Sequence, residues 1–492
     1  MKRVRFVFLM AIVLMASSYL LEAQSTSDTL KLDLKQSLEL LIEQNPAVNA
    51  ANQANKQMEY ELKATHGLYM PKVGVSANFG IVSEAVTIDH SPIGKALEGL
   101  YSLSAGQVQM LGALNPAITS TVEYQTLLQG AQEGLAKVQA ANWKTELLGD
   151  NVGMVSANVS WPIFTGGKIM AANNAAKAKV AESEEKARMI TNGEVTSLVQ
   201  RYYGLQLTIE VSKVRESVVN GMLEHLDNAK KLEKNGMISE AERLHAEVAY
   251  AEANRELKKA LGDVELMQTA LKNVLNVDKP IYPTGNLFIA ANLQSVDDYV
   301  NRAKELNPIF GQLEQKRIQA SQAILKERSA YLPDVAVIGS YDIYRHQISD
   351  MVVPDWFVGV GLKLNIFDGL AKNNKVQAAK IQRSQVDTYR EKASLDITTG
   401  VTKVYQQMLQ AKEQYESSAV SIKFAEEYLR VRQKAFGEGF ATSTEVVDAN
   451  MNLSRVKVEQ LKAMYDFDIA LATLLELVGD SQSFTQYTTS VK

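Results

Sequence analysis

The chain has 492 residues, of which 22% are charged and 46% hydrophobic, with a formal net charge of -4 and no cysteine. Without cysteine it cannot form a disulfide framework, a zinc–thiolate site, a cysteine nucleophile or a lipidated cysteine. The 5 histidines lie far apart without an HExxH motif, and the mildly acidic charge gives no general footprint for nucleic acid. We therefore expect no enzyme, no cofactor and no nucleic-acid partner.

The N-terminal segment has the layout of a cleaved signal peptide. Basic residues at positions 2, 3 and 5 precede an apolar run over 6–15, and we predict that residues 1–23 are removed on export. An uncleaved anchor helix is the alternative, but the run is shorter than the ~20 residues that a bilayer requires. No later stretch is long and apolar enough to cross a membrane as a helix, so the mature protein is either soluble or crosses a membrane as strands.

The rest of the chain is a duplication. Segments of the first half recur in the second half in the same order: 69–75 matches 331–337, 45–46 matches 307–308, 163–166 matches 366–369, and Gly236 matches Gly439. The offset between matches changes once, because the first half carries an inserted segment. The repeats span residues 33–277 and 295–480, a non-helical linker with prolines covers 278–294, and a polar tail follows at 481–492.

Each repeat is expected to begin with a helix. Residues 33–68 have helical periodicity and open with Asp33 and Gln36 at the spacing of a capping box. Ser295 and Asp298 stand at the matching positions of the second repeat. Both helices should therefore start at a side-chain cap.

Strands are expected after these helices, because apolar residues then alternate with small or polar ones. The alternation predicts strands over residues 72–81, 152–163, 334–345 and 356–367. Each has about the length and the pattern of a transmembrane strand with lipid on one face and water on the other. A half-buried strand of a soluble sheet shows the same alternation, but four such strands behind a signal peptide favour the membrane. A long inserted loop over 82–151 joins the first two, and outer-membrane barrels place long loops outside the cell.

Aromatic residues flank the predicted strands. Tyr69 and Tyr331 stand just before the first strand of each predicted hairpin. Trp161, Phe164 and Phe367 stand at the ends of the returning strands. Hairpins bring these strand ends to one rim, so the aromatics fit an interfacial belt, although an ordinary core could also use them.

Two long stretches without proline predict very long helices. They run from Gly166 to Gly236 and from Gly369 to Gly439, with apolar residues at spacings of three and four, as in a coiled coil. An unbroken helix of that length would be about 100 Å long. A shorter helix returns after each, and the lengths suggest a bundle two helices thick, with two short helices stacked end to end beside each long one.

The strand count requires an oligomer. Four strands cannot close a barrel, and an open edge in lipid leaves backbone hydrogen bonds unmade at several kcal/mol each. Three copies would supply twelve strands, enough for a wall that encloses water. This argument requires more than one chain but does not choose three.

The sequence resembles the TolC-like outer-membrane efflux proteins over essentially its whole mature length. The resemblance rests on the duplicated helix-strand-strand-helix-helix unit, the strand-to-helix turns at 163–167 and 366–369, and the tip segments at 235–242 and 439–449. It implies a mostly α protein with a membrane β-barrel: a homotrimer with a twelve-stranded barrel in outer-membrane lipid and a long helical barrel through the periplasm of a Gram-negative bacterium.

The resemblance also implies a function and partners. Such a protein would be the exit duct of a tripartite efflux or type I secretion system, docked onto a periplasmic adaptor and an inner-membrane pump. A periplasmic coiled-coil scaffold or adaptor without a channel is the alternative. That alternative would explain the helices but not four alternating strands at matched repeat positions.

Acidic residues at the two helix-turn-helix tips are the candidate site residues. Glu242 and Glu445 each follow a hydroxyl residue at capping-box spacing, which predicts a cap, whereas Asp448 lies one turn further along the same face. By resemblance, Glu445 and Asp448 match an acidic pair that lines the periplasmic constriction, and Glu242 matches an acidic member of the gate network. Ala441 stands where a characterised relative has a gate arginine, so the closed state must use other contacts.

Glycines mark the tips themselves. Gly236 and Gly439 each fall between two helices, where a left-handed backbone favours glycine, and we expect them to shape the surface that docks the adaptor. Lys231 and Lys434 precede them at the same repeat position. These lysines either complement the helix dipole or face the adaptor.

Overall fold

The computed structural model describes residues 29–488 and divides them into two compact units, which are described separately. The helical unit comprises residues 29–65, 171–324 and 375–488, and the strand unit comprises 66–170 and 325–374. The predicted signal peptide at 1–23 lies outside the described residues.

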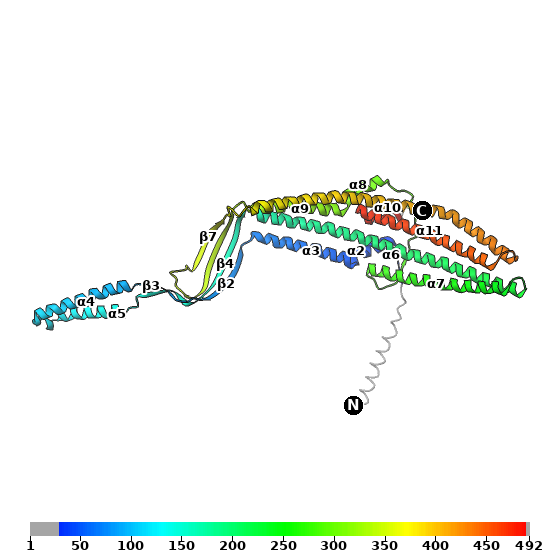
Figure 1. The fold of residues 1–492 in the computed structure, drawn as a ribbon. Coiled ribbons are helices and arrows are strands. Elements are labelled where there is room, and N and C mark those ends of the chain that lie inside the picture. The colour runs from blue at the N-terminus through cyan, green and yellow to red at the C-terminus, as the bar shows by residue number, and fades with distance from the viewer. Residues whose placement is uncertain (1–28, 489–492) are drawn as a thin grey trace, which may run out of the picture. The chain divides into compact units, whose positions relative to one another are not determined.

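Four helices dominate the helical unit: α6 (Lys168–Lys234), α7 (Glu240–Leu275), α10 (Ala371–Gly437) and α11 (Ser443–Val478) (Figure 1). α6 and α10 have 67 residues each, and α7 and α11 have 36 each, so the duplication is preserved in helix length. At ~1.5 Å per residue, each long helix measures about 100 Å. Within residues 29–488, no helix combines the length and the apolar composition that a membrane span needs.

The opening helix of each repeat is broken. Two helices replace each predicted one: α2 (Leu34–Gln44) with α3 (Pro46–His66), and α8 (Val296–Leu306) with α9 (Pro308–Ser329). Asn45 is extended at φ -66° and ψ 126°, because proline disfavours the helical conformation of the residue before it. The prediction of one continuous helix over 33–68 was therefore wrong, while the capping boxes at Asp33 and Ser295 are confirmed.

The two breaks make the same contact in both repeats. The Asn45 side-chain amide donates to the carbonyl of Val274 at 3.0 Å, and that of Asn307 donates to the carbonyl of Leu477 at 2.7 Å. Each bond satisfies a carbonyl in the last turn of a returning helix, where intrahelical donors run out. Each returning helix is thereby fixed beside the break of an opening helix.

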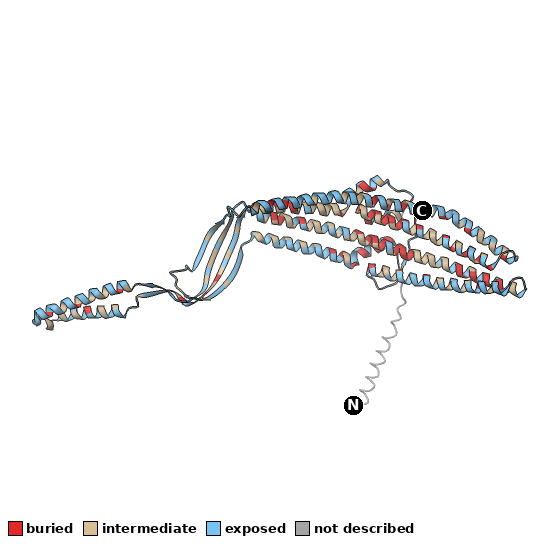
Figure 2. Ribbon diagram, in the orientation of Figure 1, coloured by how far each residue is buried: buried red, intermediate tan, exposed pale blue. Residues whose placement is uncertain are grey.

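Buried residues gather around the middle of the helical unit (Figure 2). Three rings, Tyr203, Phe288 and Phe484, pack there at centroid distances of 5.9 to 6.0 Å. The predicted polar tail is therefore wrong in part, because residues 484–488 form α12 (Phe484–Thr488) and Phe484 is fully buried. The linker contains a strand as well: β5 (Ile281–Pro283) pairs in parallel with β1 (Leu30–Leu32).

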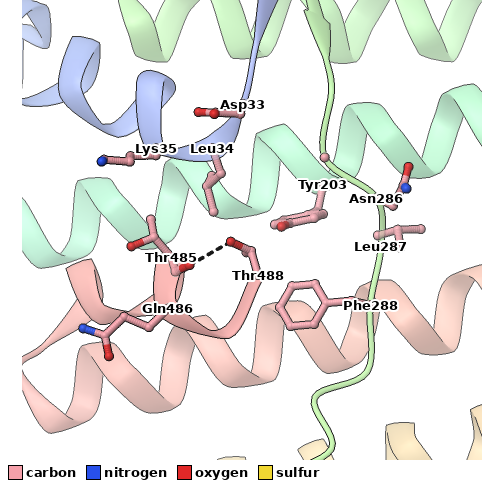
Figure 3. A pocket seen from close by; sticks show the side chains of 11 residues that line it. Asp33, Leu34, Lys35, Tyr203, Asn286, Leu287, Phe288, Thr485, Gln486 and Thr488 are labelled. Atoms are coloured by element: carbon pink, nitrogen blue, oxygen red, sulfur yellow. Dashed lines mark hydrogen bonds between the residues drawn. The ribbon is translucent and has the colours of Figure 1, made fainter. Parts of the chain in front are cut away.

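A pocket of about 520 Å³ adjoins this cluster (Figure 3). Tyr203 and Phe288 line it together with Asp33 and Lys35. The Asp33 carboxylate already accepts the backbone N–H of Gln36 at 2.7 Å as the cap of α2. The pocket therefore offers no pair of free carboxylates for acid–base chemistry.

The strand unit contains a sheet of antiparallel neighbours in the order β2-β4-β6-β7. Its strands are β2 (Lys72–Ile81), β4 (Lys144–Thr165), β6 (Asp334–Ile348) and β7 (Trp356–Lys363). β2 coincides with its predicted range, whereas β4 begins earlier and β7 ends before the predicted 367. β7 stops at Lys363 because Lys363 pairs with Asp334, and Pro333 before it has no N–H to extend the ladder.

The outer strands carry an exposed apolar face. Seven alternating side chains of β2 and β7 are 65% to 77% exposed: Val73, Val75, Phe79, Ile81, Val358, Val360 and Leu362. Within the described residues, β2 pairs only with β4 and β7 only with β6, so both outer edges are free. The sheet is thus open at both sides and apolar on one face.

The inserted segment is folded, which corrects the prediction of a long loop over 82–151. It contains β3 (Val86–Asp89), α4 (Ser91–Leu114) and α5 (Val122–Ala140) (Figure 1). Pro92 stands in the first turn of α4, and the Thr121 side chain caps α5. The segment therefore has ordinary helix-start signals and forms a helical hairpin.

Candidate functional site

The two tips have the same backbone geometry. Gly236 adopts φ 70° and Gly439 adopts φ 80°, as predicted, and no atom lies within 4 Å of the place where a Cβ would stand. The N–H of Met237 donates to the carbonyl of Leu232 at 2.9 Å, and the N–H of Phe440 donates to that of Ala435 at 2.8 Å. This bond closes the end of each long helix, so glycine is needed for its backbone conformation and not for space.

Glu445 caps α11. The N–H of Glu445 donates to Thr442 Oγ1 at 3.3 Å, and the N–H of Thr442 donates to Glu445 Oε2 at 3.2 Å. The guanidinium of Arg432 on α10 also lies 3.5 Å from Glu445 Oε2. The capping interpretation of Glu445 is therefore confirmed, and Arg432 neutralises part of its charge.

Glu242 acts differently from its repeat counterpart. The N–H of Glu242 donates to the capping Ser239 Oγ at 3.4 Å. The Glu242 carboxylate instead reaches the other tip, where its Oε2 accepts the N–H of Ser443 at 2.7 Å. Ser443 is fully buried at the start of α11. This charge-assisted bond joins the first turns of α7 and α11, so Glu242 links the two tips instead of closing its own capping box.

His225 on α6 completes this link. Its Nε2 and the Ser443 hydroxyl share a hydrogen bond at 2.8 Å, and its ring packs on Phe436 at a centroid distance of 4.6 Å. Burial lowers the pKa of His225 to about 4, with a further contribution from nearby His245 that the Glu242 carboxylate opposes. The imidazole is therefore neutral at neutral pH.

An apolar cluster lies beneath these polar contacts. Its buried members are Leu226, Ala229, Ala246, Phe436 and Val446, and partly buried Ala441 packs against it. Ala441, which stands where a characterised relative has a gate arginine, therefore packs against apolar side chains. The side-chain contacts at the tips within one chain are Glu242 to Ser443, His225 to Ser443 and Arg432 to Glu445.

The remaining predicted tip residues are exposed. Asp448 is one turn beyond Glu445, and its exposed side chain makes no hydrogen bond or ion pair with residues 29–488. Lys231 and Lys434 lie in the last turns of α6 and α10 with exposed side chains. Of the acidic residues predicted for a constriction, Asp448 therefore carries the least compensated charge. Among the described residues, no cluster of acidic and histidine side chains could hold a metal ion.

The five predicted belt aromatics are exposed residues of the strand unit. Tyr69, Trp161, Phe164 and Tyr331 are about half exposed, and Phe367 follows the end of β7. The Trp161 indole N–H donates to the carbonyl of Tyr69 at 2.9 Å. This bond joins the start of β2 to the end of β4, so at least these two aromatics stand at one rim of the sheet.

Comparison with known proteins agrees with this architecture. Residues 299–480 match the family model of the outer membrane efflux proteins. The matched segment covers most of the second repeat. The matching caps, breaks and tips of the first repeat identify it as a second copy of the same unit. The family resemblance and the mostly helical fold predicted from the sequence are therefore confirmed.

Individual proteins are similar to this chain at low sequence identity. The protein CyaE of Bordetella pertussis is 21% identical over 276 residues, which cover 54% of this chain and 57% of CyaE. CusC, whose crystal structures concern transmembrane channel formation, matches with a TM-score of 0.68 at 12% identity, covering 93% of this chain and 95% of that one. The open MtrE outer membrane channel of Neisseria gonorrhoeae matches with a TM-score of 0.65 at 14% identity, covering 91% and 89%. This chain thus spans little more than half the length of CyaE. Its similarity to CusC and MtrE is a similarity of fold.

Proposed function

We propose that the protein is the outer-membrane exit duct of a tripartite efflux or type I secretion system. The open sheet carries this proposal, because its two outer edges are free and its outer strands expose apolar side chains. In lipid, each unpaired backbone group at such an edge costs several kcal/mol. Pairing β2 of one copy with β7 of the next removes the edges, and three copies give a closed wall of twelve strands.

The location and partners follow from this assembly. The barrel lies in outer-membrane lipid of a Gram-negative bacterium, with the belt of Tyr69, Tyr331, Trp161, Phe164 and Phe367 at one interface. The long helices extend the duct through the periplasm towards an adaptor and an inner-membrane pump. A periplasmic scaffold or adaptor without a channel would leave the exposed apolar strands without a role.

Acidic residues at the tips form the constriction in this proposal. A homotrimer contributes three copies of each side chain, so Asp448 and Glu445 form stacked rings of carboxylates. Asp448 supplies most of the field, because Glu445 is compensated by Arg432 at 3.5 Å. Glu242 holds the tips together through Ser443 at 2.7 Å and so opposes opening. Such rings attract cations and repel anions.

The tip turns form the adaptor-docking surface. Gly236 and Gly439 set two similar turns, and Lys231 and Lys434 present exposed positive charges at the same distance before them in the sequence. Similar turns on both repeats give the trimer six related docking positions. The repetition supports a partner that recognises the turn itself.

Membrane fractionation and conductance test the proposal. The protein should fractionate with the outer membrane, keep its β-sheet signal in detergent on heating, and raise the conductance of a planar bilayer. A protein that stays in the soluble periplasmic fraction and leaves the bilayer non-conducting would contradict it.

A further inference from the structure

The helical hairpin α4–α5 uses one face of α4 for its own packing. Positions removed from solvent recur at spacings of three and four on that face: Gly94, Leu97, Tyr101, Ala105, Val108 and Gly112. Aromatic rings fill the space beside the glycines, since a Cβ at Gly94 would lie 2.6 Å from the Trp143 ring, and one at Gly112 would meet the Tyr124 ring. The intrachain seam is therefore complete.

A second seam on α4 has no partner in the chain. Its apolar residues follow a heptad spacing and are at least 57% exposed: Ile93, Leu100, Leu103, Met110 and Leu114. Ala96 and Gln107 complete the spacing, so the seam contains no charged residue. Apolar residues at alternating steps of three and four are the pattern by which one helix packs against another. An exposed apolar stripe of this kind marks an interaction surface.

Small residues border this second seam. Gly99, Gly106 and Ala113 follow one another at heptad spacing, and open space surrounds the missing Cβ of both glycines. Glycine inside a helix lowers helix stability relative to alanine. Nothing in the hairpin explains these two glycines, whereas close approach of another helix would.

The sheet positions the hairpin for a partner copy. β3 pairs with β4 from Val86 opposite Leu148 to Asp89 opposite Lys144, which continues the β2–β4 ladder to the foot of α4. The N–H of His90 donates to the carbonyl of Trp143 at 2.7 Å across that foot. Copies joined through the free sheet edges therefore carry their α4 helices at the same end and in the same direction. Rotational symmetry then sets identical seams at the same height, as a parallel coiled coil requires.

We propose that the second seam of α4 packs against α4 of the other copies and forms a parallel helical bundle beyond the strands. This inference rests on the oligomeric duct proposed above and adds a second contact between copies, outside the barrel. The occupant is a second copy of this chain, because the seam is uncharged, follows the heptad spacing and is anchored on the sheet that must itself pair with copies.

Disulfide trapping tests the inference in the full chain, which has no cysteine of its own. Leu103→Cys lies on the seam, and Gln109→Cys is a control at an exposed polar position on another face of α4. In outer membranes under mild oxidation, Leu103→Cys should give about ten times more covalent dimer than the control, because packing raises the effective thiol concentration. The native mass of each variant is measured on the same extract, so that oligomer formation is known independently.

A second variant tests whether the disulfide depends on packing of the seam or forms by chance collision between copies. Leu100→Glu combined with Leu103→Glu should abolish the disulfide formed by Met110→Cys while leaving the native mass of the oligomer unchanged. Both leucines are largely exposed in the single chain, so the hairpin should still fold.

Several outcomes would overturn the inference. An intact oligomer in which Leu103→Cys gives no more dimer than Gln109→Cys refutes the α4 contact and leaves the duct proposal standing. Modification of Leu103→Cys by a lipid-soluble maleimide but not by a water-soluble one would place the seam on the bilayer. Free modification by the water-soluble reagent would show an uncovered seam. Absence of any oligomer would remove both proposals.

Discussion

Replacing Glu242 by alanine should open the tip. The substitution removes the 2.7 Å bond from the Ser443 N–H and leaves that buried donor unpaired at the start of α11. A hydrogen bond to a charged group contributes about 2 kcal/mol, which corresponds to a ~30-fold change in the equilibrium between joined and parted tips. In single-channel recordings, the open probability of Glu242→Ala should rise by about that factor, up to saturation.

Glu240→Ala is the matched control for this experiment. Glu240 lies in the same first turn of α7 and carries the same charge, but it pairs with Arg243 at 3.5 Å and does not contact Ser443. Glu242→Gln retains an acceptor oxygen and should give an intermediate open probability. If Glu242→Ala opens the channel no more than Glu240→Ala does, the bond to Ser443 does not hold the tips together.

Three further predictions concern the tips. Gly439→Val should abolish efflux complementation without loss of barrel insertion, because φ 80° strains a β-branched residue. Lowering the pH from about 6.5 to 4 should loosen the tip, and hydrogen exchange would measure this. The reason is that the buried His225 has a pKa lowered to about 4, whereas an exposed His225 in an opened tip takes up its proton at a higher pH. Stability from His225 is thus present above the ordinary pKa and lost as pH falls. Glu445→Gln with Asp448→Asn should reduce cation selectivity and block by multivalent cations, and Asp448→Asn alone should account for most of the loss.

Each of these three predictions has its own control variant and its own contradicting result. Gly437→Val changes a glycine in the last turn of α10 that lacks a positive φ, so it should retain complementation; equal loss in both variants would argue against a docking turn. His225→Gln should remove the pH dependence and exposed His245→Gln should keep it, whereas the reverse would identify another titrating group. An unchanged ion preference in the double carboxylate variant would show that these residues do not line the constriction.

Local features of the fold were predictable because adjacent residues determine them. The turn at Gly439 and the caps at Asp33, Ser295 and Thr442 each depend on a few neighbouring positions. The duplication then transferred each local inference to the other repeat. The helix breaks at Asn45 and Asn307 could also have been predicted, since a proline follows each. They were missed because helical periodicity continues on both sides of each break.

Contacts between distant segments could not be predicted. Glu242 has the spacing of a capping box, and only the fold places it beside Ser443, 201 positions away. His225 stands in a long helix among other polar residues, and its burial depends on Phe436 from the second repeat. The inserted hairpin was missed for another reason: Pro92 and Thr121 were visible start signals, but the barrel interpretation favoured a loop at that place.

Native mass measurement of the protein extracted from outer membranes tests the central claim most directly. The free edges of β2 and β7 must be paired by other copies if the sheet lies in lipid. The account predicts a detergent-resistant particle of three chains. A monodisperse, soluble single chain would contradict it.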